Sequence, residues 1–243
     1  MYDSLETQKS KELLIELTRE CNKRKIPIAL IGGWGAFFHV NSRYREAFGK
    51  DYTESRDIDI FFDPNKEKEF HDLIKLKGFQ ESGYYFRWEK IYSRTTKTFI
   101  TQEEARKEEI FNLIYIFLDL FSNKETKVLK SWWNIGILKN ISYIQIDEFS
   151  VADINTLIGL KCTALFERDK ADKETKDACD IYALLQYSGK EIVPTPLIVE
   201  AIKKILNRFD LLYYIATHVI LNSGNQDIVE ITLRDILKQF TEK

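Results

Sequence analysis

The sequence predicts an α+β fold: a mixed β-sheet with flanking helices, followed by an α-helical domain. Two observations indicate it. Short apolar, β-branched and aromatic segments concentrate between residues 26 and 147, whereas apolar residues at helical spacing dominate from residue 150 onward. The 243 residues are 44% apolar, which is enough for one large or two small globular domains. We therefore expect one domain over residues 1–148 and a second over residues 149–243.

The expected first domain begins with an amphipathic helix over residues 5–24, because its leucines recur at helical spacing. An apolar strand at 28–31 ends in two glycines, and a short helix over about 34–39 follows. Polar and small residues predict a loop or broken helix over 41–56. The remaining elements expected in this domain are a strand at 57–62, a helix from Pro64 to about residue 77, strands within 79–121 and a strand at 140–147.

The expected second domain consists of helices separated by Gly, Pro and Asn turn signals. Ser150 is the predicted N-cap of its first helix, with Asp153 three residues later in the first turn. The predicted helices cover residues 151–169, 173–187, 196–207, 209–221 and 226–240.

Composition and charge exclude several classes of protein. Thirty-six basic and 38 acidic side chains give a formal net charge of −2, which is not the strongly basic balance of a sequence-independent nucleic-acid coat. The polar N-terminus predicts no signal peptide, and the longest apolar run, Ile110 to Phe121, is too short for a membrane-spanning helix. Three widely separated cysteines indicate neither a disulfide framework nor a zinc site. We therefore expect a cytoplasmic protein with no membrane partner.

The segment DIDIFF at residues 57–62 carries the first chemical signal. Residues two apart in a strand share a face, so Asp57 and Asp59 point the same way. Two such carboxylates repel each other, and a hard divalent cation is the natural compensation. A solvated strand end with two acids is the alternative.

Two further signals lie on neighbouring segments. The glycines Gly32 and Gly33 follow an apolar strand and permit close approach of the backbone to a phosphate at the start of the next helix, although a tight turn without a ligand also explains them. Asp119 lies within an apolar strand, where a carboxylate is costly to bury unless it is paired or bound to metal. A strand that exposes one face is the alternative for Asp119.

Together, these features resemble the DNA polymerase beta-like nucleotidyltransferase superfamily over residues 26–122. The matching positions are Gly32-Gly33 after the first strand, Asp57 with Asp59 on the next, and Asp119 on a later strand. Twenty-three residues separate Gly33 from Asp57, which is longer than the superfamily pattern implies and places Arg43, Arg45 and Arg56 beside the site.

Residues 149–186 resemble a segment of AbiEii toxin-like nucleotidyltransferases with the pattern K-x-x-A-L-x-x-R…D-x-x-D-h-x-x-L. The matching residues are Lys161, Ala164, Leu165, Arg168, Asp177, Asp180, Ile181 and Leu184. Helical spacing places Lys161 on or beside an apolar stripe, from which its ammonium reaches solvent along a packed stem or points into a cleft. Whether Arg168 and Asp177 are partners in a structural ion pair or site residues stays open.

The resemblance implies a nucleotidyltransferase-type fold with a catalytic domain at 1–148 and a helical domain at 149–243 that completes the nucleotide and acceptor site. It implies two Mg²⁺ (or Mn²⁺) ions held by Asp57 and Asp59, with Asp119 sharing one of them and helping to activate the acceptor. The nucleotide-binding residues implied are Gly32 and Gly33 around the triphosphate, Lys161 and Arg56 beside the leaving pyrophosphate, and Asp180, which orients Lys161 or touches the acceptor.

The implied reaction moves a nucleoside monophosphate from an NTP to an acceptor hydroxyl and releases pyrophosphate. An RNA or tRNA end is the favoured acceptor, and the AbiEii-like segment adds a role as the toxin of a toxin–antitoxin pair with a cognate antitoxin. Three alternatives stay open: a small-molecule (antibiotic) nucleotidyltransferase, a protein-modifying one, and an NTP-binding regulatory module without turnover.

Overall fold

The computed structural model describes residues 3–124, 126, 141–167 and 171–242. The chain forms two compact units: Met1–Gly35 with Thr53–Ala152, and Ala36–Tyr52 with Asp153–Lys243. The expected division after residue 148 differs from this one in two ways. Residues 149–152 belong to the first unit because they form a strand of its sheet, and residues 36–52 belong to the second.

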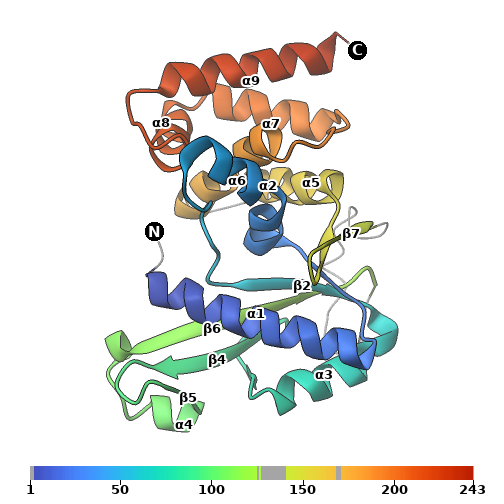
Figure 1. Cartoon of the computed structure of the whole chain (residues 1–243), viewed down its shortest axis with the longest axis vertical. Helices are drawn as coiled ribbons and strands as arrows, with labels where there is room; N and C mark the ends of the chain where they lie inside the picture. The colour runs from blue at the N-terminus through green and yellow to red at the C-terminus, as the bar shows by residue number, and fades with distance from the viewer. Residues whose placement is uncertain (1–2, 125, 127–140, 168–170, 243) are drawn as a thin grey trace. The chain divides into compact units, whose positions relative to one another are not determined.

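The described part of the first unit contains an eight-stranded mixed sheet with the order β3-β4-β6-β2-β1-β8-β7, and β5 pairs with β4. Parallel pairing joins β2 to β6 and β1 to β8, and the other neighbours are antiparallel. The strands are β1 Ile28–Leu30, β2 Ile58–Phe62, β3 Gln80–Glu81, β4 Arg87–Ser93, β5 Thr98–Ile100, β6 Leu113–Phe121, β7 Tyr143–Ile146 and β8 Phe149–Ala152. The prediction of an α+β fold with a mixed sheet is confirmed (Figure 1).

Helices α1 (Ser4–Arg24) and α3 (Glu67–Leu76) pack on one face of this sheet. Residues 58, 60 and 62 of β2 are fully buried on that face, where the ring of Phe62 stacks on Phe70 of α3 at a centroid distance of 5.4 Å. The alternation of a strand therefore turns Asp59 and Phe61 to the opposite face. A short helix, α4 (Gln102–Ala105), and 3-10 turns at Pro64–Lys66 and Ile110–Asn112 complete the first unit.

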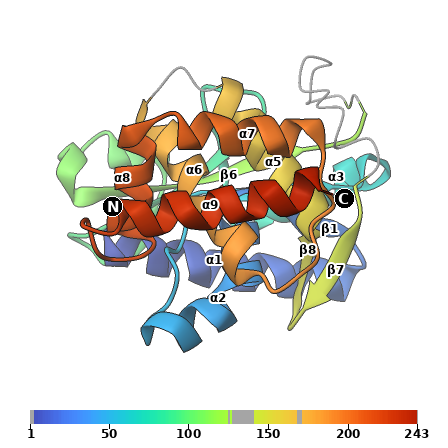
Figure 2. The same ribbon diagram turned by 90° about the horizontal axis from the view of Figure 1, so that it is seen from above.

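The second unit is helical, as predicted. Its helices are α5 Ile154–Glu167, α6 Ala171–Tyr187, α7 Pro196–Leu206, α8 Phe209–His218 and α9 Gln226–Thr241. Helix α9 packs against α7 and α8 (Figure 2). None of the helices in the described part of the chain has the length and hydrophobicity needed to cross a bilayer.

Helix α2 (Gly32–Phe48) is longer than the sequence predicts, because the segment 41–56, expected to be a loop or a broken helix, continues the helix as far as Phe48. Its second half is held by aromatic packing. Tyr44 is 1% exposed, its hydroxyl donates to the carbonyl of Val219 at 2.7 Å, and its ring contacts those of Phe48 and Tyr187. Tertiary packing thus overrides the polar composition of this segment.

The expected helix N-cap at Ser150 is wrong. Ser150 lies in β8, opposite Gln145 of β7, and α5 begins at Ile154. Asp153 caps this helix instead: its carboxylate accepts from the backbone N–H groups of Asn155 at 2.9 Å and Thr156 at 3.2 Å. The preceding residues extend the sheet, so the acid three residues later takes the capping position.

Candidate functional site

The carboxylates of Asp59 and Asp119 lie on neighbouring strands of the sheet. Asp59 is the second residue of β2, and the parallel pairing of β2 with β6 sets it directly opposite Asp119. Opposed residues of paired strands project on the same face. The structure therefore brings together two acids that are 60 positions apart in the sequence, as the sequence pattern predicts.

Gly32 closes one side of this pair. A Cβ atom placed on Gly32 would lie 1.9 Å from Oδ2 of Asp59, so the backbone at the start of α2 rests against that carboxylate. The φ angle of Gly32 is +61°, a left-handed conformation that favours glycine. Gly33 follows in the first turn of α2. The glycine turn and the carboxylates thus form one site, in which a larger residue at position 32 would displace Asp59.

Asp57 stands just before β2. The sequence predicted a strand from residue 57, whereas β2 begins at Ile58. Its Oδ1 accepts from Nε of Arg56 at 3.1 Å, and both side chains are partly exposed. The guanidinium of Arg56 also lies 5.7 Å from the ring centroid of Phe117 on β6. Arg56 is therefore held at the edge of the carboxylate group, and its role in nucleotide binding, which the resemblance implies, stays a prediction.

Arg87, the first residue of β4, binds Asp119 with both ends of its guanidinium. The antiparallel pairing of β4 with β6 sets Arg87 opposite Asp119, and Nε and Nη2 donate to Oδ1 and Oδ2, each at 2.6 Å. The guanidinium lies 4.4 Å from the ring centroid of Phe117. Asp119 is 7% exposed. A buried carboxylate with an arginine in this two-pronged geometry is a well-matched ion pair.

The electrostatics of Arg87 connect it to all three acids. Its hydrogen bonds to Asp119 raise the pKa of the guanidinium above its ordinary value against the opposing effect of burial, and the charges of Asp119, Asp57 and Asp59 raise it further. Arg87 is therefore charged at every physiological pH and belongs to the same electrostatic group as the three carboxylates.

Oxygen ligands from Asp57, Asp59 and Asp119 have the chemistry that Mg²⁺ or Mn²⁺ requires. A metal site also requires that such ligands are grouped around one point. Within the part of the chain that the structure describes, no three His, Cys, Asp or Glu side chains are grouped to hold one metal ion. Both oxygens of Asp119 bind Arg87. Asp57 and Asp59 thus fit a metal ion in donor type, whereas a metal ion at Asp119 has to compete with the charge of Arg87, which binds both of its oxygens.

Lys161 and Asp180 belong to the second unit, where they form a buried polar network. Nζ of Lys161 lies 2.5 Å from Oδ2 of Asp180 and 3.1 Å from Oδ1 of Asp177. The hydroxyl of Tyr52 donates to Oδ1 of Asp180 at 2.9 Å. Lys161 is 7% exposed, and Asp177 and Asp180 are each 3% exposed. The ammonium therefore does not reach solvent along its stem, and the carboxylates of Asp177 and Asp180 hold it inside the second unit. The role of Lys161 beside the pyrophosphate and that of Asp180 toward Lys161 or the acceptor stay predictions.

Charge interactions dominate this network. Burial opposes the charged form of Lys161, yet Asp180 and Asp177 outweigh it and raise the pKa of the ammonium above its ordinary value. Burial, with the charge of Asp180, raises the pKa of the Tyr52 hydroxyl as well. Asp177 is thus a structural ion-pair partner of Lys161. Arg168, the partner that the sequence suggested for Asp177, lies outside the described residues.

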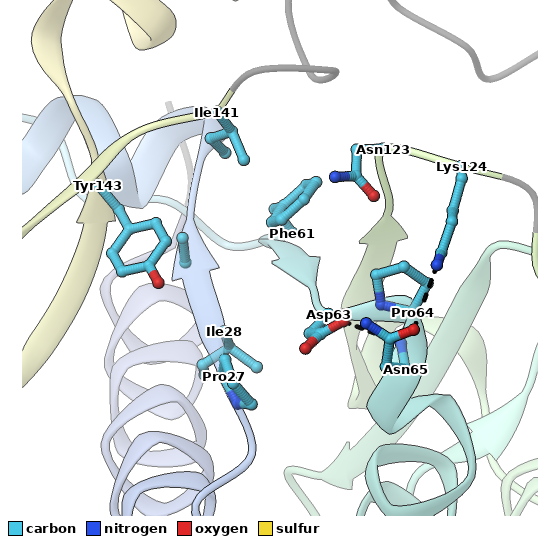
Figure 3. A pocket seen from close by; sticks show the side chains of 11 residues that line it. Pro27, Ile28, Phe61, Asp63, Pro64, Asn65, Asn123, Lys124, Ile141 and Tyr143 are labelled. Atoms are coloured by element: carbon cyan, nitrogen blue, oxygen red, sulfur yellow. Dashed lines mark hydrogen bonds between the residues drawn. The ribbon is translucent and has the colours of Figure 1, made fainter.

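A cavity of about 330 Å³ lies in the first unit, farther along β2 and past the end of β6 (Figure 3). Apolar side chains form much of its wall, and Lys124 Nζ donates to Oδ1 of Asn65 at 3.2 Å on one side. The cavity is lined by Pro27, Ile28, Ala29, Phe61, Asp63, Pro64, Asn65, Asn123, Lys124, Ile141 and Tyr143. None of the residues expected in the site lines this cavity, so it is distinct from the carboxylate group.

Arg87 is the site residue that the sequence did not reveal. It stands in an aromatic segment, Tyr84 to Trp88, that reads as strand packing. Only the register of β4 against β6 sets it opposite Asp119. A charged residue directly after three aromatic residues is the one signal that could have indicated a buried acidic partner.

No protein-family model matches the chain, and no curated protein matches it. Solved structures that resemble it include nucleotidyltransferase-like proteins. A structure of an antigenic nucleotidyltransferase-like protein from Paracoccidioides brasiliensis is 14% identical, with a TM-score of 0.49, over 88% of this chain and 98% of that chain. ANT(2″)-Ia in complex with adenylyl-2″-tobramycin is 12% identical, with a TM-score of 0.42, over 92% and 96% of the two chains.

A solution structure of the antibiotic-resistance factor ANT(2″)-Ia is 12% identical, with a TM-score of 0.38, over 98% of this chain and 97% of that one. At such identities and TM-scores, these likenesses assign neither a reaction nor a substrate to this chain. The chemistry has to be inferred from its own residues.

Proposed function

We propose that this protein is a nucleotidyltransferase that uses a divalent metal ion to move a nucleoside monophosphate from an NTP to an acceptor hydroxyl. One observation carries the proposal: the backbone of Gly32 rests on the carboxylate of Asp59, which stands opposite Asp119 in the sheet. A glycine turn at a helix start is suited to phosphate, and adjacent carboxylates are suited to a hard cation.

The chain's own residues have distinct roles in this proposal. Asp57 and Asp59 hold the metal ion, and the N–H groups of the first turn of α2, from Gly32 and Gly33, face the triphosphate. A bound Mg²⁺ or Mn²⁺ supplies Lewis-acid polarisation of the phosphate oxygens. Arg56, which pairs with Asp57 at the edge of the carboxylates, is proposed to bind the nucleotide phosphates.

The proposed transfer is a single displacement at the α-phosphorus. The acceptor hydroxyl gives its proton to the carboxylate of Asp119, its oxygen bonds to phosphorus, and the bond from phosphorus to the pyrophosphate oxygen breaks, so that pyrophosphate leaves. The favoured acceptor is an RNA or tRNA end in the context of a toxin–antitoxin pair. An antibiotic or a protein hydroxyl would require the same chemistry at the site.

The test is transfer of label from α-³²P NTPs, with Mg²⁺ or Mn²⁺, to tRNA, total protein and aminoglycosides in parallel reactions. We expect the wild type to label one acceptor class and Asp59→Asn to lose about two to four orders of magnitude in rate. Asp72→Asn is the matched control, because it makes the same change on the exposed side of α3.

Equal rates in the wild type and Asp59→Asn would remove the carboxylate pair from the reaction. An absence of label in every acceptor would contradict the transferase assignment. Calorimetry would then distinguish a regulatory module, which binds the nucleotide without turning it over, from a chain that binds no nucleotide.

A further inference from the structure

The ion pair between Arg87 and Asp119 is built into the sheet. Both residues lie on hydrogen-bonded strands in direct register, and two N–O distances of 2.6 Å close the pair. Their side chains are 21% and 10% exposed. The ring of Phe117, two residues before Asp119, lies 4.4 Å from the guanidinium carbon. Arg87 is therefore a preorganised partner and not a surface side chain that meets Asp119 by chance.

This pair nearly balances the charge of the site. The carboxylates of Asp57, Asp59 and Asp119 and the guanidiniums of Arg56 and Arg87 sum to a formal charge of −1. A divalent cation that took an oxygen of Asp119 would weaken one of the two bonds of Arg87 and set its guanidinium beside a dication. The guanidinium and the dication carry like charges, which repel strongly in a partly buried site.

A metal-bound triphosphate presents a different case. Its negatively charged oxygens can replace the carboxylate of Asp119 as the partner of Arg87. Arginine pairs with phosphate in the same two-pronged geometry as with carboxylate. We propose that Arg87 is a latch on Asp119 that metal-bound nucleoside triphosphate releases and that the metal ion alone does not. Arg87 then exchanges Asp119 for a phosphate oxygen, while Asp119 becomes available to the metal. This inference rests on the proposed function and names the ligand form that loads the site.

The first experiment measures Mn²⁺ binding to the protein without nucleotide, by electron paramagnetic resonance and calorimetry. We expect weak binding by the wild type and an affinity at least tenfold higher in Arg87→Gln, because the mutation removes the competing cation and makes the site more negative. Arg94→Gln is the control: it breaks an ion pair with Asp3 outside the carboxylate group and should leave the Mn²⁺ affinity unchanged.

Arg87→Lys covers the case in which Arg87→Gln does not fold. Its ammonium keeps the charge but cannot make two parallel bonds, so we expect an intermediate gain in Mn²⁺ affinity, about threefold or more. An unchanged Mn²⁺ affinity in the folded variants would overturn the proposal.

The second experiment measures Mn²⁺ affinity with and without a non-hydrolysable NTP analogue. In the wild type, we expect the analogue to increase Mn²⁺ affinity by at least tenfold beyond the affinity of the free analogue for the ion, and Arg87→Gln should lose most of this coupling. Full coupling in Arg87→Gln would also overturn the proposal.

Neither readout depends on turnover, so the two proposals fail separately. A gain of Mn²⁺ affinity in Arg87→Gln together with loss of the nucleotide coupling, without detectable transfer by the wild type, would uphold the latch and contradict the transferase. Transfer by the wild type with no gain of Mn²⁺ affinity in Arg87→Gln would uphold the transferase and contradict the latch.

Discussion

Gly32 is the residue at which backbone conformation and site chemistry meet. Its φ of +61° lies in the left-handed region, and its α-carbon stands so close to Asp59 that a methyl group has no room there. Gly49, at the end of the same helix, has a φ of +67° and no atom within 4 Å of an added Cβ. The two glycines therefore separate the effect of backbone strain from the effect of contact with the carboxylate.

We expect Gly32→Ala and Gly49→Ala each to lose about 1–2 kcal/mol of unfolding free energy from the left-handed conformation. Only Gly32→Ala should also displace Asp59 and lower the affinity for metal-bound NTP by about tenfold or more. Denaturant melts measure the first effect and calorimetry the second. Unchanged nucleotide affinity in Gly32→Ala would show that the close approach to Asp59 is not needed for binding.

At the scale of single elements, local pattern predicted most of the helices and the main strands, and it failed where distant contacts decide. Residues 41–48 are polar enough to read as a loop, yet the packing of Tyr44 keeps them helical. Ser150 has the properties of an N-cap, yet pairing with β7 makes it part of a strand. Neither contact is visible in the sequence, because each joins segments whose spacing along the chain carries no periodic signal.

The same limit applies to the site. The spacing of Asp57, Asp59 and Asp119 and the glycine turn are local patterns, and the structure places Asp59 against both Gly32 and Asp119. Arg87 was missed because its position depends on the register of two strands that are 32 residues apart at the contact. A one-residue shift in that register would have turned Arg87 to the other face.

Helices α5 and α6 are joined by the ion pairs of Lys161, and this contact gives a prediction for the pair of elements. Lys161→Met should lower the unfolding free energy by about 3–5 kcal/mol, because it leaves the buried carboxylates of Asp177 and Asp180 without their cation. Lys203→Met on α7 removes an exposed pair with Glu200 and should change stability by less than about 1 kcal/mol.

Thermal and denaturant unfolding of the two lysine variants measure the difference. A Lys161→Met protein as stable as Lys203→Met would mean that the buried network contributes nothing to the pairing of α5 and α6.

At the scale of the molecule, each unit is made of two separate stretches of chain. The chain passes from the first unit to the second within α2, returns at Thr53, and leaves again after Ala152. The cysteines distribute over the two units: Cys21 lies in α1, and Cys162 and Cys179 lie in α5 and α6. All three are unpaired and buried, so each thiol reports on the opening of its own unit.

Burial raises the pKa of the Cys21 and Cys162 thiols to about 12 and that of Cys179 well above its ordinary value. At pH 8, a thiol with a pKa of 12 is a thiolate in roughly one molecule in ten thousand, and the thiolate is the reactive form. We therefore expect native protein to resist iodoacetamide, whereas Thr95→Cys, at an exposed position, should react as a free thiol does.

In increasing denaturant, site-resolved mass spectrometry after a short alkylation pulse gives a labelling midpoint for each cysteine. Cys162 and Cys179 should share one midpoint, because α5 and α6 pack together and are joined by Lys161. Cys21 reports on the first unit, because α1 belongs to that unit. Separate midpoints for Cys162 and Cys179 would mean that α5 and α6 do not unfold cooperatively, and rapid labelling of Cys21 in native protein would contradict its burial.

In Lys161→Met, the shared labelling midpoint of Cys162 and Cys179 should move to a lower denaturant concentration, because the variant loses the ion pairs that join α5 and α6. The labelling midpoint of Cys21 in the same variant shows whether the first unit unfolds together with these helices.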